Sequence, residues 1–227
     1  VTNIDKEHLD FYQNLNNLMK AFIKFIEKTP PIGKAFLCID DDYTEQIIKK
    51  LKTKNYFTYG FNKKANYQIC NPRYKIGYTK FDLKIKSVGQ NYLYIKDISL
   101  KLIGKYNVLN ATAAIALCLS LGLKIKVIKK ALKSFSGVQR RLTKVFKKNK
   151  IEFYDDYAHH PTEIKSVLEA VRRVATKRKI ITIFQPHRYS RVKTLKSEFA
   201  SCFKNTDQVI LCPVYSAGES TDKEYNQ

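Results

Sequence analysis

A nine-residue segment rich in ionisable side chains, at residues 155–163, constrains the fold more than any other stretch. Its sequence is DDYAHHPTE, and the β-branched and aromatic residues at 151–154 before it predict a short strand. Pro161 and Glu163 are typical of a helix start. We therefore expect a strand, a loop with two carboxylates, a phenol and two imidazoles, and then a helix. Parallel α/β folds place ligands at such connections, although a structural role, in which Asp155 and Asp156 cap the helix and His160 packs, is equally compatible with these residues.

The chain before residue 62 alternates between strand and helix character, which indicates an open, mostly parallel α/β sheet. The expected strands are 1–4, 35–39 and 56–61, and the expected helices are 15–27 and 44–51. From residue 67 the pattern predicts a small antiparallel β piece, with a turn at residues 71–72 and strands at 67–70, 75–85 and 92–102. Helical patterns return at 107–121 and 127–135.

A second α/β unit is expected beyond a linker at residues 137–141. Its predicted strands are 142–147, 151–154, 180–184 and 209–213, and its predicted helices are 161–175 and 192–203. We therefore predict two domains, at residues 1–137 and 138–227, the second of them a Rossmann-like α/β domain.

The net charge of +22 is the unusual feature of the composition. Clustered lysine and arginine can bind nucleic-acid phosphates, but here the charge is spread over nearly every segment, so a nucleic-acid partner is not expected and a compositional bias is favoured. The five cysteines are scattered without a CxxC pair, which is typical of a reducing compartment. No apolar stretch approaches the roughly 20 residues that span a bilayer, and we predict a cytoplasmic protein without a membrane partner.

A second stretch that can carry chemistry is GKYNVLNA, at residues 104–111. Asn107 and Asn110 are three residues apart, so on a helix they share one face. A carboxamide can pair with adenine N6 and N7, which makes asparagine a plausible adenine-binding residue. The residues alone leave open the alternative that Asn107 is only the N-cap of the helix.

Several segments together resemble the motifs of the Mur ligase family. They are the DDYAHHPTE and GKYNVLNA stretches, TNIDKEHLD at 2–10, GVQRRL at 137–142, FQPHRYSR at 184–191 and VYSAGE at 214–219. The departures from the family pattern include Glu7 for Asp, Tyr106 for His and Leu142 for Phe. The resemblance implies part of the central ATP-binding domain at 1–137 and part of the C-terminal amino-acid-binding domain at 138–227.

The resemblance also implies roles for individual residues. Asn107, Asn110, Arg141 and Asp156 are expected to bind ATP, with Arg141 at the phosphates and Asp156 at the ribose. His8, Arg141 and Asp156 are the expected catalytic residues, and His8 is the expected contributor to a Mg²⁺ site. The resemblance also places His187, Arg188 and Arg191 at the carboxylate of the incoming amino acid. Tyr157 and His159 are expected beside them, because the loops after residues 154 and 184 both leave strands of the same predicted sheet. Arginine suits the phosphate and carboxylate roles because its guanidinium forms paired hydrogen bonds with oxygen atoms.

The activity that the resemblance implies is an ATP-dependent acid–amino-acid ligation in peptidoglycan precursor synthesis. L-alanine would be joined to the lactoyl carboxylate of UDP-N-acetylmuramate through an acyl phosphate, with ATP and Mg²⁺ required. The 227 residues contain no G-x-x-x-x-G-K-[ST] phosphate loop. We therefore expect that loop and a UDP-binding domain to precede Val1, and the last part of the C-terminal domain to follow Gln227. The chain alone is expected to be inactive. A murein tripeptide-recycling relative, a catalytically dead remnant and a basic nucleic-acid-binding domain remain the alternatives.

Overall fold

The computed structural model describes residues 1–86 and 91–220, which form two compact units. Unit 1 comprises Val1–Arg73, Tyr78–Lys101 and Tyr106–Phe135. Unit 2 comprises Tyr74–Gly77, Leu102–Lys105 and the described residues from Ser136 onward. Within the described ranges, no helix combines the length and the apolar character needed to cross a bilayer.

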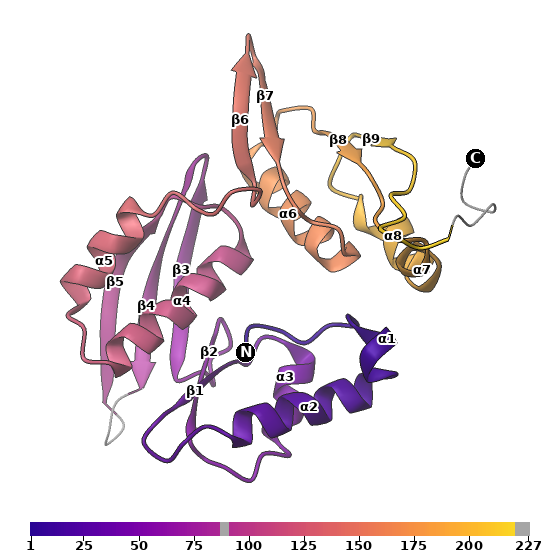
Figure 1. Cartoon of the computed structure of the whole chain (residues 1–227). Helices are drawn as coiled ribbons and strands as arrows, with labels where there is room; N and C mark the ends of the chain where they lie inside the picture. The colour runs from indigo at the N-terminus through magenta and orange to yellow at the C-terminus, as the bar shows by residue number, and fades with distance from the viewer. Residues whose placement is uncertain (87–90, 221–227) are drawn as a thin grey trace. The chain divides into compact units, whose positions relative to one another are not determined.

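Unit 1 is built on one five-stranded sheet (Figure 1). Its strands lie in the order β1 (Ala35–Cys38), β2 (Tyr56–Gly60), β3 (Tyr67–Lys75), β4 (Tyr78–Lys86) and β5 (Tyr92–Leu100). The pairs β1–β2 and β2–β3 are parallel, and β4–β5 is antiparallel. The predicted antiparallel piece therefore continues the same sheet, and the predicted mixed α/β class of this region is confirmed.

Among the described residues of unit 1, four helices lie beside this sheet, and a short fifth helix contacts one of them. The four are α2 (Leu15–Glu27), α3 (Asp42–Ile48), α4 (Lys105–Ser120) and α5 (Ile125–Ser134), and the short helix α1 (Leu9–Tyr12) contacts α2. Figure 1 shows α4 and α5 beside strands β3 to β5, and α2 and α3 beside β1 and β2. The α4 residues Val108, Ala111, Thr112, Ile115 and Ala116 are buried, and their spacing is that of one helical face. The small alanine side chains on this face allow α4 to pack closely.

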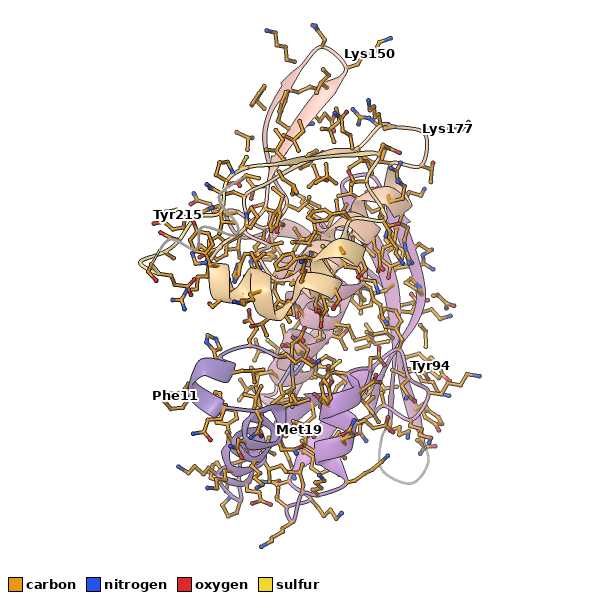
Figure 2. All side chains as sticks on the ribbon, turned by 90° about the vertical axis from the view of Figure 1, so that its right-hand side faces the viewer. Phe11, Met19, Tyr94, Lys150, Lys177 and Tyr215 are labelled. Atoms are coloured by element: carbon orange, nitrogen blue, oxygen red, sulfur yellow. The ribbon has the colours of Figure 1, made fainter. Side chains whose placement is uncertain are left out.

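The apolar spacing that predicted α2 also fixes what it packs against. Leu18, Met19 and Ile26 are buried in one cluster with Leu37 of β1 and Ile47 of α3. Figure 2 shows the labelled Met19 on α2. The helix begins after Asn14, whose side-chain oxygen accepts a hydrogen bond from the Asn17 N–H at 2.9 Å.

Two local predictions for unit 1 are wrong. Residues 1–4 form no strand, because only Val1 bonds to the β1 backbone and the Ile4 N–H donates to the Asp41 side chain instead, at 3.2 Å. The predicted turn at residues 71–72 lies inside β3. Strand β2 pairs only with the first residues of β3, so the N–H that Pro72 lacks is not needed for a hydrogen bond to β2. The chain turns at Gly77 instead, where φ is 80°.

Unit 2 contains two separate pairs of strands. The antiparallel pair is β6 (Thr143–Lys148) with β7 (Ile151–Asp155), and the parallel pair is β8 (Ile181–Phe184) with β9 (Gln208–Leu211). Helices α6 (Pro161–Val174), α7 (Tyr189–Thr194) and α8 (Lys196–Cys202) complete the unit. A small cluster of buried side chains, Ile164, Leu168, Phe184 and Cys202, joins α6, β8 and α8. The helix predicted at 192–203 is two helices, because Leu195 between them has φ −115° and ψ 29°, outside the helical range.

Candidate functional site

In unit 1, the predicted adenine-binding residues lie in the first two turns of α4. Asn107 is half-buried and Asn110 is exposed, and both lie beside the buried face that begins at Val108. The helix begins at Lys105, two residues earlier than predicted, so Asn107 lies inside the helix and is not its N-cap. That position removes the structural alternative considered for Asn107 and leaves two carboxamides spaced three residues apart on one rigid helix.

His8 lies directly before α1 and is exposed. Its backbone is left-handed, with φ 56°, and its carbonyl oxygen accepts hydrogen bonds from the Phe11 and Tyr12 N–H groups, both at 3.0 Å. Residues 1–86 and 91–220 contain no group of three or more His, Cys, Asp or Glu side chains that could hold a metal ion. Mg²⁺ is bound mainly through oxygen ligands, so the role of the His8 imidazole beside the ion stays a prediction, and no chemical step is assigned to the ion.

In unit 2, the segment that most constrained the fold forms the predicted strand, loop and helix. His160 is the N-cap of α6, and its ring nitrogen accepts from the Thr162 N–H at 3.4 Å. The Glu163 carboxylate accepts in return from the His160 N–H at 3.3 Å, which completes a capping box. Pro161 occupies the first helical position, where its missing N–H costs nothing. The loop between Asp155 and His160 is therefore held from its helical end.

Asp156 holds the same loop from its other side. One carboxylate oxygen accepts from the Leu142 N–H and the other from the Ala158 N–H, each at 2.7 Å. Burial raises the pKa of Asp156 above its ordinary value, and these two N–H donors and Arg141 oppose that rise. The side chain thus joins the start of β6 to the start of the loop, and it is not a cap of α6.

The two arginines before β6 face this loop. Arg141 Nη1 lies 3.5 Å from the Glu163 carboxylate. Arg140 lies 3.5 Å from the Asp155 carboxylate, and its guanidinium carbon lies 4.8 Å from the centre of the Tyr157 ring, within cation–π range. The backbone adds a hydrogen bond from the Tyr157 N–H to the Arg140 carbonyl oxygen, at 2.8 Å. The end of the predicted linker at residues 137–141 is therefore fixed against the residue 155–158 loop.

The FQPHRYSR stretch forms a second loop, between β8 and α7. His187 forms an isolated parallel bridge with Tyr215, and the Arg188 N–H donates to the Tyr215 carbonyl oxygen at 2.8 Å. Arg191 Nη1 lies 3.2 Å from the His187 carbonyl oxygen and 3.3 Å from its ring Nδ1. The Glu219 carboxylate accepts from the Ser190 N–H and hydroxyl. Residues 214–219 thus hold this loop in place through these contacts.

The two loops of unit 2 meet at their histidines. The ring centres of His159 and His187 are 6.0 Å apart, and the His187 ring lies 5.5 Å from that of Tyr215 and the His159 ring 5.1 Å from that of Tyr157. Burial lowers the pKa of His187, and Arg191, His159 and Arg188 lower it further. Near neutral pH His187 is thus an uncharged imidazole beside two guanidinium groups, an arrangement that suits an anionic ligand carrying an amine.

Unit 2 therefore brings seven predicted site residues close together. They are Asp156, Tyr157 and His159 of one loop, His187 and Arg188 of the adjoining loop, Arg191 of α7, and Arg141 of the segment before β6. His8 lies before α1 and Asn107 and Asn110 lie on α4, all three in unit 1. Sequence reasoning gave no site role to Arg140, Glu163, Tyr215 and Glu219. Glu163 stood out only as a helix-start residue, and the VYSAGE stretch only as a family motif, because their contacts are with residues distant in the sequence.

Comparisons with known proteins match both units. The profile described as the Mur ligase middle domain matches residues 1–118, and the profile described as the Mur ligase, glutamate ligase domain matches residues 140–226. The UDP-N-acetylmuramate–L-alanine ligase of Pelagibacter ubique is 51% identical over 219 residues, covering 96% of this chain and 47% of that protein. The enzyme of the same name from Brucella anthropi is 43% identical with the same coverage.

A solved structure agrees with these relatives. The UDP-N-acetylmuramate-alanine ligase of Thermotoga maritima superposes with a TM-score of 0.71 at 32% identity, covering 96% of this chain and 46% of that one. The chain thus spans about half the length of the relatives that it matches.

Proposed function

The chain belongs to the Mur ligase family, and from this premise we propose that the whole protein joins L-alanine to the lactoyl carboxylate of UDP-N-acetylmuramate, with ATP as the energy source. The observation that carries the proposal is the 51% identity to a UDP-N-acetylmuramate–L-alanine ligase, over an alignment that covers 96% of the chain. The reaction belongs to peptidoglycan precursor synthesis, and we propose that it takes place in the cytoplasm, where the five free cysteines would stay reduced.

The chemistry requires an activated carboxyl group, because a free carboxylate is a poor electrophile. Transfer of the terminal phosphoryl group of ATP to the lactoyl carboxylate gives an acyl phosphate and ADP. The amine of L-alanine then attacks the acyl carbon, and phosphate leaves as the amide forms. The protein's contribution to such a reaction is mainly positioning and the neutralisation of charge.

We propose that Asn107 and Asn110 bind the adenine, Asp156 the ribose and Arg141 the phosphates. Asp156 and Arg141 lie on the same loop system of unit 2, which supports assigning them to one ligand. His8 stays a predicted magnesium-side and catalytic residue to which we assign no step. We place the domain boundary between residues 137 and 138, in the segment just before the two arginines.

The amino-acid end of the proposed site is the pair of loops around His159 and His187. Arg188 and Arg191 supply guanidinium groups for the substrate carboxylate, and Tyr157 and His159 leave room for a small side chain. The exposed positive charge of the chain favours these anionic substrates, and we propose no nucleic-acid partner.

Ligation by the whole protein tests the proposal directly. We expect formation of UDP-N-acetylmuramoyl-L-alanine, ADP and phosphate when all three substrates are present, and no product when ATP is omitted. A murein tripeptide offered in place of L-alanine distinguishes the recycling class of Mur ligase. Faster ligation of the tripeptide than of L-alanine, or the absence of any ligation, would overturn the proposed activity.

Arg188→Lys tests the amino-acid end of the site. The substitution keeps the positive charge and removes the guanidinium fork, so we expect the KM for L-alanine to rise about 10-fold, equivalent to ~1.4 kcal/mol for one charge-assisted contact. The KM values for ATP and UDP-N-acetylmuramate should stay within about 2-fold of the wild-type values. A change confined to the KM for ATP would instead assign this loop to nucleotide binding.

A further inference from the structure

The Glu163 carboxylate receives contacts from two directions. Its Oε2 atom accepts from the backbone N–H groups of His159, at 3.1 Å, and His160, at 3.3 Å, and it lies 3.7 Å from the His159 ring nitrogen Nδ1. Its Oε1 atom lies 3.5 Å from Arg141 Nη1. One side chain therefore touches both the proposed phosphate-binding arginine and the loop of the proposed amino-acid end.

A helix cap explains only half of these contacts. The capping box at the start of α6 requires an acceptor for the backbone N–H groups, and Oε2 alone supplies it. Arg141 belongs to the segment before β6 and takes no part in the cap. The ion pair on Oε1 thus has no role in starting the helix, and it connects two segments that lie 22 residues apart in the sequence.

The charge state of Glu163 supports a lasting ion pair. Burial acts to raise the pKa of Glu163, but the N–H groups of His159 and His160, with the charges of His159 and Arg141, outweigh it and lower the pKa below its ordinary value. The carboxylate therefore stays ionised at neutral pH, where it can hold a guanidinium group. Both partners are partly exposed, so the pair is one of modest strength.

We infer that Glu163 is a positioning residue that holds Arg141 through one carboxylate oxygen and the His159 loop through the other. The inference rests on the proposed function and deepens it, because the nucleotide side and the amine side of the reaction then share one anchor. Two substitutions should separate the two sides. Losing the charge releases Arg141 while the backbone hydrogen bonds to the loop remain, whereas losing the whole side chain releases Arg141 and the loop together.

Glu163→Gln is the decisive variant, since its amide oxygen still accepts from the His159 and His160 N–H groups while the charge that attracts Arg141 is gone. We expect the KM for ATP of the whole protein to rise about 3-fold, which corresponds to the loss of a partly exposed ion pair, with the KM for L-alanine unchanged. In Glu163→Ala we expect both KM values to rise. Glu169→Gln makes the same change at an exposed position of the same helix and should match wild type in both.

A second measurement keeps the inference independent of turnover. In the 227-residue chain, nitrogen-15 relaxation of the Arg141 guanidinium should show faster local motion in Glu163→Gln than in wild type and in Glu169→Gln. Unchanged Arg141 motion in Glu163→Gln would overturn the inference, whatever the activity of the whole protein. If the wild-type protein is active and Glu163→Gln leaves its KM for ATP unchanged, the inference is overturned as well. If the wild-type protein is inactive but Arg141 moves faster in Glu163→Gln, the ligase proposal is refuted and the contact between Glu163 and Arg141 stands.

Discussion

In unit 1, Phe81, Leu83 and Ile98 of neighbouring strands have no exposed surface, whereas the strands of unit 2 leave much of their apolar surface exposed. The exposed side chains of unit 2 include Val145, Phe146, Ile151, Phe153, Ile181, Ile183, Ile210 and Leu211. Ion pairs add to its small apolar cluster, such as Arg141 with Glu163, Lys144 and Arg178 with Glu152, and Arg172 with Asp207. The loops proposed to meet the substrates belong to this unit, whose buried apolar cluster is small.

This difference has a physical consequence for function. Apolar burial involves no titrating group, and a close-packed core tolerates little change in volume. Hydrogen bonds and ion pairs fix the direction of individual side chains, and single substitutions at them release one loop at a time. Figure 2 shows the labelled Lys150 at the tip of the β6–β7 hairpin, away from the small core of unit 2. We therefore expect core substitutions to disturb unit 1 most and polar substitutions to disturb unit 2 most.

The largest expected effect comes from Phe81→Ala. Phe81 is fully buried (0% exposed), and its loss should lower the free energy of unfolding of unit 1 by ~3–5 kcal/mol. Phe146→Ala is the matched change in unit 2, where the ring is 50% exposed and stacks on Phe153 at 4.0 Å, and should cost only ~0.5–1.5 kcal/mol. Amide hydrogen exchange of β4 and of β7 measures the two losses separately. Equal losses in both units would break the comparison.

Asp156→Ala is expected to have the next largest effect. The substitution leaves the Leu142 and Ala158 N–H groups without their carboxylate acceptor, which should cost ~1.5–3 kcal/mol. If Asp156 also contacts the nucleotide, kcat/KM for ATP in the whole protein should fall about 10- to 150-fold. Asp155→Ala, at the exposed neighbour that pairs with Arg140, should lower it less than about 5-fold. Similar losses in the two variants would remove the distinction between the two carboxylates.

The smallest expected effect is a pH dependence of the β6–β7 hairpin. Hydrogen bonds from Lys144 and Tyr154 lower the pKa of Glu152 to about 2, with the charges of Lys144 and Arg178 acting in the same direction. Because the folded pKa lies below the ordinary 4.5, Glu152 stabilises the hairpin above pH 4.5, and this contribution is lost as the pH falls toward about 2. Carbon-13 NMR titration of the Glu152 carboxyl measures the midpoint directly.

Two lysine variants provide the control for that titration. In Lys144→Ala the Glu152 midpoint should move from about 2 toward 4.5, since the 3.1 Å contact with the ammonium group is lost. Lys148→Ala removes an equal charge from the same strand at an exposed position and should leave the midpoint near its wild-type value. A wild-type midpoint near 4.5 would show that these polar contacts do not hold the hairpin.

The sequence alone determined several of the local elements and the family. Apolar residues at helical spacing located α2 at both of its ends, and the strand, loop and helix around residue 155 followed from β-branched residues, a proline and an acid. The motif resemblance placed the chain among the Mur ligases, as both family profiles confirm. These predictions succeed because each depends only on consecutive residues, whose backbone preferences and periodicity determine local structure.

Tertiary structure decided which side chains meet. It extended β3 through Pro72, diverted the Ile4 N–H to Asp41 and divided the last predicted helix at Leu195. It also brought Arg141 to Glu163. Such contacts depend on how the chain returns to itself after many residues, and on the burial that makes one acceptor preferable to another. Local backbone preference contains no information about such long-range contacts or about burial. The contacts of Glu163 with Arg141 and of Asp156 with Leu142 are therefore seen only in the folded structure.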